Sequence, residues 1–120
     1  MVKDNNKIRA FKTAWFAKAA KKAKIKDAEL RIAIQQVMLG QADDLGGGVF
    51  KKRLNENRHR SIIVAKGGNY WIYTYLFAKK DRDNIDVDEL AEFRDMADDY
   101  AIFTDYDVDM AIKNGKIVEI

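Results

Sequence analysis

Basic side chains gather on three successive segments that otherwise have the apolar pattern of β-strands. They are Lys51, Lys52, Arg53, Arg58, Arg60, Lys79, Lys80 and Arg82. Arginine offers a planar fork of donors that matches phosphate oxygens, and lysine offers a point charge that can transfer a proton when its pKa is lowered. Neighbouring cations are one cause of such a lowered pKa. The types and spacing of these residues therefore favour a site for a phosphodiester.

If the phosphodiester belongs to RNA, a reaction without a metal ion becomes available. The 2′-OH can attack the adjacent phosphate when one group removes its proton, a second stabilises the charge at phosphorus and a third protonates the leaving 5′-oxygen. Clustered cations can serve all three roles. The hypothesis is an RNA-cleaving site in which the RNA supplies its own nucleophile.

His59 and the aromatic residues of the last basic segment each allow two interpretations. His59 is the only histidine and could act as a general base or acid, because an unperturbed imidazole titrates near neutral pH. As the first residue of a strand it could equally be a turn or stacking residue. Tyr70, Trp71, Tyr73 and Tyr75 could stack on bases, although aromatic residues in a strand usually belong to the core.

Charge is divided unevenly along the chain. Residues 1–82 carry 19 Lys and Arg against 7 Asp and Glu, whereas residues 83–120 carry 3 against 12. The basic part is where a polyanion would bind. With no Cys and one His, the 120-residue chain offers no disulfide framework, thiolate zinc site or histidine-rich cluster, so we expect neither a metal nor a cofactor. No signal-peptide core or membrane-spanning run is present, so we expect a cytoplasmic protein without membrane contact.

Two helices are expected before the basic segments, after a first strand over residues 7–11. Thr13 is placed to cap the first helix, and Asp27 opens a second helix that ends at Gly40. The second helix has one apolar stripe, formed by Leu30, Ala33, Ile34, Val37 and Met38. The short connection predicts a helical hairpin whose apolar face lies on a sheet.

Strands are expected over residues 49–54, 60–66 and 70–78, joined by the short connections "NENRH" and "KGGN". The Gly67-Gly68 pair suits a tight turn better than a phosphate-binding loop, because no helix starts after it. "SIIVA" and "YWIYTYLFA" are apolar on both alternating faces, which indicates central strands that are covered on each side.

Strand alternation places Lys51 and Arg53 on one face and Lys52 on the other, beside Phe50 and Leu54. Arg60 begins the next strand, directly across a short turn from Arg53. The cations that leave the following strand are Lys79, Lys80 and Arg82. Three strand ends should therefore bring cations toward one surface of the sheet.

The acidic C-terminal part has a helical pattern. Asp86 and Glu89 have capping-box spacing, and an apolar stripe follows at Leu90, Phe93, Ala97 and Tyr100. A last helix should run from about Thr104 to Gly115. The carboxylates around Asp86 are explained better by helix capping than by magnesium binding. The expected order is β-α-α-β-β-β-α-α, an α+β fold in one domain over residues 1–120.

Three blocks carry a resemblance to a known family: "LGGGVFKKRL", "HRSIIVAKGG" and "YLFAKKDRDNID". The chain resembles the RelE/HigB-type toxins of bacterial type II toxin–antitoxin systems, in the RelE/ParE superfamily. The resemblance implies a small twisted antiparallel sheet with an N-terminal helical hairpin on one face, followed by C-terminal helices. It also implies a metal-independent, ribosome-dependent endoribonuclease that cleaves mRNA in the decoding site, inhibits translation and is neutralised by a cognate antitoxin.

The resemblance assigns residues position by position. The implied catalytic residues are Lys51, Arg53, Arg60, Lys80 and Arg82. The remaining residues of the basic segments are expected to bind RNA: Lys52, Arg58, His59 and Lys79. The resemblance implies that Lys51 or Arg53 transfers the proton. It also implies that Arg60 and Lys80 stabilise the phosphate. Since a guanidinium stays protonated, Lys51 is the favoured base.

The chain departs from the family pattern in its C-terminal segment. Some relatives use a tyrosine there to stack on or orient the RNA, but "DNIDVDEL" has none, and Tyr100 and Tyr106 are candidates by proximity in sequence alone. Two alternatives share this fold: a ParE-like toxin that poisons DNA gyrase, and a module that binds nucleic acid without cutting it. The cation cluster favours the ribonuclease, because gyrase poisoning does not require it.

Overall fold

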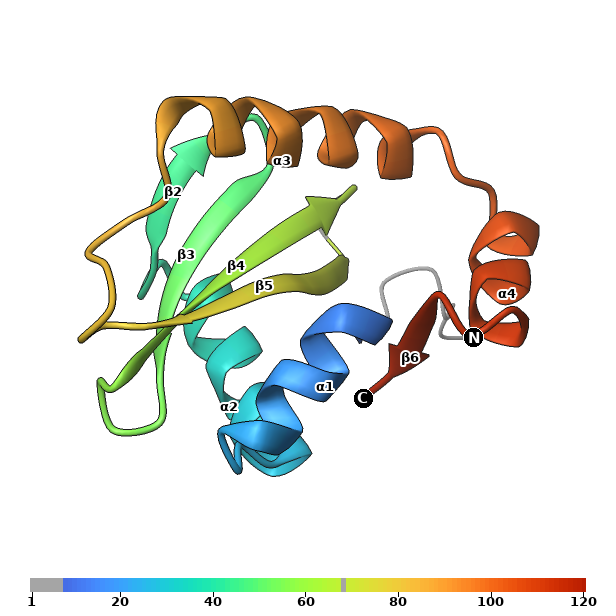
Figure 1. The fold of residues 1–120 in the computed structure, drawn as a ribbon. Helices are drawn as coiled ribbons and strands as arrows, with labels where there is room; N and C mark the ends of the chain where they lie inside the picture. The colour runs from blue at the N-terminus through green and yellow to red at the C-terminus, as the bar shows by residue number, and fades with distance from the viewer. Residues whose placement is uncertain (1–7, 68) are drawn as a thin grey trace.

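The protein forms one mixed sheet with helices on both faces (Figure 1). The computed structural model describes residues 8–67 and 69–120. Its helices are α1 (Ala14–Lys22), α2 (Asp27–Met38), α3 (Val87–Ala101) and α4 (Asp105–Lys113). Its strands are β1 (Arg9–Thr13), β2 (Asp43–Gly46), β3 (Val49–Leu54), β4 (His59–Lys66), β5 (Tyr70–Ala78) and β6 (Ile117–Glu119). None of the helices described is long and apolar enough to cross a membrane.

The strand order is β2-β3-β4-β5-β1-β6, and every pair is antiparallel except β1 with β5. Consecutive strands β2 to β5 form a meander because their connections are short. Strand β1 runs parallel to β5 and pairs with it only from Tyr70 to Tyr73. The predicted α+β class with a small, mainly antiparallel sheet is therefore confirmed.

The helical hairpin α1–α2 covers one face of the sheet, as predicted. Thr13 caps α1, since its hydroxyl accepts a hydrogen bond from the Phe16 amide at 3.1 Å. Phe16 and Leu30 are completely buried against this face. The Tyr73 hydroxyl donates to the Leu30 carbonyl at 2.8 Å and ties the middle of the sheet to α2.

Helices α3 and α4 cover the opposite face, which makes β4 and β5 buried central strands. The capping box of α3 is present: the Asp86 carboxylate accepts from the Glu89 amide, and the Glu89 carboxylate accepts from the Asp86 amide. Leu90 and Phe93 of α3 pack on Val49, Ile62, Phe77 and Ile85. The acidic helix therefore lies over the face to which Lys51 and Arg53 belong.

Four details differ from the sequence-based expectations. Strands β2 and β6 were not expected; each is short and lies at an edge of the sheet, where weak apolar patterning is tolerated. Met38 is 45% exposed because it is the last residue of α2. The first strand runs Arg9–Thr13 and not over residues 7–11; Lys7 lies outside the described residues, as does Gly68 of the expected turn.

Candidate nucleic-acid interface

Two arginines face each other across the β3–β4 pair. Arg53 is directly opposite Arg60 in the register, and Lys51 lies two residues along β3 on the same face. Like charges directly opposite in a sheet are destabilising. Among the described residues, no carboxylate forms an ion pair with either arginine. This arrangement costs stability in the protein alone and is suited to an anion placed between the two strands.

The backbone holds the Arg60 side chain without neutralising it. Arg60 is only 8% exposed, and its Nη1 donates to the carbonyls of Asn57 at 3.1 Å and His59 at 3.2 Å. Carbonyl oxygens fix the direction of a guanidinium but carry no formal charge. Arg60 therefore keeps its full positive charge in a fixed place beside Phe77, its partner on β5.

Lys51 and Lys52 point to opposite faces, as alternation predicts. The Lys51 Nζ lies 3.6 Å from the Asp43 carboxylate of β2, a pair in which Asp43 is largely exposed and so can be displaced at little cost. Lys52 lies on the α2 side and donates to the Gln41 carbonyl at 2.9 Å. Burial and the neighbouring Arg53 charge lower the pKa of Lys52, yet its position separates it from Arg60.

Arg82 joins the same face from the segment after β5. Its guanidinium carbon lies 5.5 Å from the centre of the Phe77 ring, next to the strand position of Arg60. Two nitrogens of Arg82 donate to the Glu89 carboxylate at 3.1 and 2.5 Å, and these bonds lower the pKa of Glu89. We call Lys51, Arg53, Arg60 and Arg82 the sheet-face cations.

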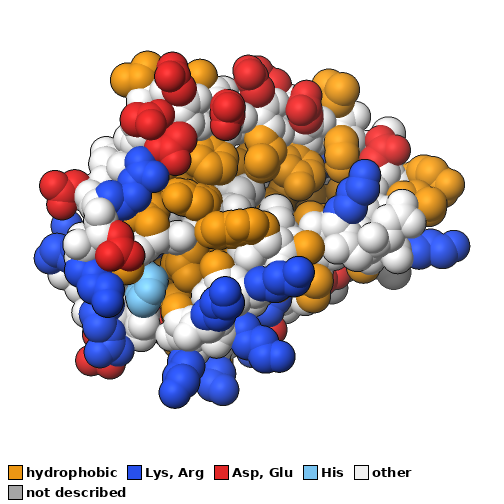
Figure 2. Space-filling view, in the orientation of Figure 1, with side chains coloured by type: hydrophobic (Ala, Val, Ile, Leu, Met, Phe, Trp, Pro, Cys, Tyr) orange, Lys and Arg blue, Asp and Glu red, His pale blue; other side chains and the backbone are white. Residues whose placement is uncertain are grey.

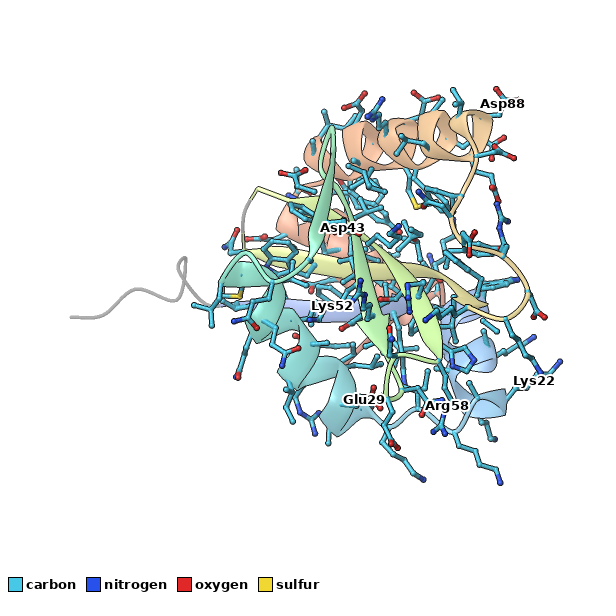
Figure 3. All side chains as sticks on the ribbon, turned by 90° about the vertical axis from the view of Figure 1, so that its left-hand side faces the viewer. Lys22, Glu29, Asp43, Lys52, Arg58 and Asp88 are labelled. Atoms are coloured by element: carbon cyan, nitrogen blue, oxygen red, sulfur yellow. The ribbon has the colours of Figure 1, made fainter. Side chains whose placement is uncertain are left out.

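The remaining predicted residues gather in a separate place, beneath the β3–β4 turn. A pocket of about 820 Å³ is lined by the basic residues Lys22, Arg58, His59, Lys79 and Lys80, together with Glu56, Asn57 and two alanines. Figure 3 shows Lys22 and Arg58 at the same end of the molecule, far from Asp88 at the start of α3. Lys80 is therefore grouped with the predicted RNA-binding residues and not with the sheet-face cations. We call this pocket the turn pocket.

His59 borders the turn pocket as a neutral imidazole. Burial lowers its pKa, and the charges of Arg58 and Lys80 lower it further against the opposite effect of Glu29 and Asp81. Its Nδ1 lies 3.2 Å from the Asn55 amide nitrogen. That amide can donate only to an unprotonated Nδ1, which leaves the proton of the neutral ring on Nε2. His59 can therefore present an N–H donor toward a ligand.

The lowered pKa of His59 predicts how stability responds to acid. The unfolded chain binds a proton at His59 near the usual pKa of 6.5, before the folded chain does, so stability is lost as the pH falls through this range. We expect the urea midpoint of the wild type to fall more, between about pH 7.5 and about pH 5, than that of His59→Gln. Equal falls in the two proteins would contradict this assignment.

A second pocket, of about 650 Å³, adjoins the turn pocket and contains residues that the sequence did not single out. We call it the edge groove; it is lined by Trp15, Lys18, Lys22, Tyr75, Phe77 and Arg82 among others. Figure 2 shows hydrophobic side chains exposed between the acidic surface of α3 and the lysine-rich surface of α1. The sequence signal that could have identified Trp15 is a tryptophan in the first turn of a basic helix.

Comparison with known proteins identifies one family. A family model described as the RelE toxin of the RelE/RelB toxin–antitoxin system matches residues 8–120, and this range contains both groups of cations. No curated protein matches the chain. No solved structure matches it.

Proposed function

Because the chain belongs to the RelE toxin family of RelE/RelB toxin–antitoxin systems, we propose that it stops translation by cleaving mRNA on the ribosome. Membership of the family makes it a toxin with an antitoxin partner. The RNA cleavage, its dependence on the ribosome and its independence of a metal ion are the proposal. The protein would act in the cytoplasm, where mRNA and ribosomes are found.

The observation that carries the proposal is the Arg53–Arg60 pair across β3 and β4. Two arginines that are opposite each other in the strand register, without a carboxylate partner in the described part of the chain, can bind a phosphate with developing negative charge. A protein that used this surface for packing alone would gain stability by replacing one arginine. The conflict between stability and charge is typical of a functional site.

The sheet-face cations can divide the reaction among them. Once RNA displaces Asp43, Lys51 in its neutral amine form accepts the 2′-OH proton as the O2′–P bond forms. Arg53 and Arg60 stabilise the charge on the phosphorus oxygens. As the P–O5′ bond breaks, the Arg82 guanidinium stabilises the charge on the leaving oxygen, which takes a proton from water. Lys80, a predicted catalytic residue, lies in the turn pocket. The products are an RNA end with a 2′,3′-cyclic phosphate and an RNA end with a 5′-hydroxyl.

The antitoxin is expected to cover these same cations. A surface with concentrated positive charge is complementary to an acidic protein segment, which would neutralise the site and exclude RNA from it. The edge strand β2, which carries Asp43 and Asp44, borders this surface. Neutralisation by an antitoxin bound elsewhere would require an indirect effect on the sheet.

Induced expression in bacteria separates the leading proposal from a gyrase-poisoning toxin. We expect incorporation of labelled amino acids to stop within minutes, with no induction of the DNA-damage response. The control is Lys51→Ala expressed to the same level, which should leave growth unaffected. Damage-response induction before translation falls would overturn the proposed activity and favour the alternative.

A further inference from the structure

The edge groove exists because β5 extends beyond the end of its pairing with β1. Strand β1 pairs with β5 only as far as Tyr73, so residues 74–78 have a strand neighbour only on the β4 side within the described chain. Helix α1 packs on β5, and Trp15 of α1 contacts Tyr75 in this part of the strand. The space between α1 and the segment that carries Arg82 forms the groove.

An exposed aromatic pair forms the apolar part of the groove. Trp15 is 51% exposed, and the centre of its ring lies 5.0 Å from that of Tyr75 at an angle of 31°. Tyr75 is supported from behind by Phe93 at 5.9 Å and Phe77 at 5.8 Å. Trp15 belongs to none of the buried clusters, whereas Phe16 beside it is fully buried. Its open face is therefore available to a ligand.

Cations surround this aromatic pair. Lys18 and Lys22 follow Trp15 by three and seven residues, which places them on the same face of α1. Arg82 lies across the groove from them, and Asp81 is the only carboxylate among the lining residues described. The groove therefore combines a flat aromatic surface with a net positive charge.

We propose that the edge groove binds an unpaired RNA base, stacked on Trp15, with its flanking phosphates on Lys18 and Lys22. The inference rests on the proposed function, and it adds an RNA-binding residue that strand patterning could not reveal. Base–aromatic stacking beside a basic track is the usual way in which proteins hold single-stranded RNA. An apolar protein segment would also cover Trp15, but it would leave the lysine charges without partners.

The geometry gives the bound base a definite relation to the cleavage site. Phe77 lines the groove, lies opposite Arg60 in the sheet register and contacts the Arg82 guanidinium. A nucleotide held at Trp15 thus lies beside Arg82, with Phe77 between it and Arg60. Stacking there would orient the neighbouring phosphodiester toward Arg60.

Trp15 can report on its own occupancy. The chain has two tryptophans, and the other, Trp71, is buried with an Nε1 that lacks a hydrogen-bond partner among the described residues. Trp71→Phe removes that unsatisfied donor and keeps the aromatic contact with Phe50. In this variant, a short single-stranded RNA with 2′-O-methyl sugars throughout should quench the Trp15 fluorescence on binding without being cut.

Substitution of Trp15 supplies the second readout. Stacking contributes about 1–3 kcal/mol per base, so Trp15→Ala should bind the oligonucleotide roughly 5- to 150-fold more weakly than the wild type. The KM of this variant for ribosome-bound mRNA should also be higher than that of the wild type. Trp15→Phe should keep most of the affinity. Ile32→Ala, which removes an exposed apolar side chain from α2, is the matched control and should change neither value.

The outcomes separate this inference from the proposed function. If the wild type cleaves mRNA on ribosomes and Trp15→Ala cleaves it with an unchanged KM, the edge groove does not hold RNA, and the proposal is overturned while the activity stands. The same result would be expected if the groove served a protein segment. If the wild type fails to cleave mRNA at all, the proposed function fails first, and binding of the oligonucleotide without quenching would overturn the inference independently.

Discussion

An mRNA with one 2′-deoxy sugar at the scissile position should remain intact on ribosomes treated with this protein. The proposed reaction uses the 2′-OH as its nucleophile, and no side chain has that role in it. We expect cleavage at that position to fall by more than about a thousandfold, because a missing nucleophile is not compensated by the remaining groups. Binding should change little, since the sheet-face cations contact phosphate oxygens.

Product ends provide the check on this experiment. The unmodified mRNA should yield a 2′,3′-cyclic phosphate or a 3′-phosphate on one fragment and a 5′-hydroxyl on the other. A 2′-O-methyl sugar at the same position should block cleavage as the deoxy sugar does. Cutting of either modified mRNA at the normal rate would show that water or a protein group attacks the phosphate.

The second large effect concerns two adjacent lysines on opposite faces of β3. Lys51→Ala should lower the cleavage rate about a hundredfold to ten-thousandfold, the usual contribution of a general base. Lys52→Ala should lower the cleavage rate much less than Lys51→Ala does. Lys52 lies on the α2 side of the sheet, where its Nζ donates to the Gln41 carbonyl. Single-turnover cleavage of ribosome-bound mRNA, with circular dichroism to confirm folding, measures both.

This pair of variants also tests whether the lysine with the lowered pKa, Lys52, is the base. A lowered pKa is what a lysine base needs, so chemistry alone would favour Lys52, whereas position favours Lys51. Loss of activity in Lys52→Ala with normal cleavage by Lys51→Ala would contradict our assignment of the base. Lys113→Ala, on the exposed surface of α4, is the control for a general loss of positive charge.

Local chemistry made most of the fold predictable. Helix caps at Thr13 and at Asp86 with Glu89 depend on residues three apart, so the sequence shows them directly. Strand alternation likewise separated Lys51 and Arg53 from Lys52, and the short turn correctly predicted that Arg60 lies opposite Arg53. These features are determined within one or two neighbouring elements.

Long-range pairing was harder to predict. Strand β6 is three residues long and exists because it pairs with β1, from the other end of the chain. Strand β2 carries two aspartates, a composition that strand propensity disfavours, but it lies at an edge where charged side chains stay in water. Neither segment has the apolar alternation on which a sequence-based prediction depends.

The candidate site shows the same division. The spacing of Lys51, Arg53 and Arg60 was visible in the sequence, whereas the Trp15–Tyr75 contact joins α1 to β5 and depends on how far β1 runs along that strand. The separation of Lys80 from Arg82 into different pockets was also hidden, because it follows from the path of the chain after β5. Residues two apart in sequence can therefore serve different parts of one RNA.

Primer extension on mRNA bound to purified ribosomes tests the central claim most directly. With wild-type protein, we predict a new reverse-transcriptase stop within the codon in the decoding site. It should be absent without ribosomes, and absent or strongly reduced with Lys51→Ala. Full-length extension products with active wild-type protein, at concentrations that arrest growth on expression, would contradict the account and show that this RelE-family chain is toxic by another route.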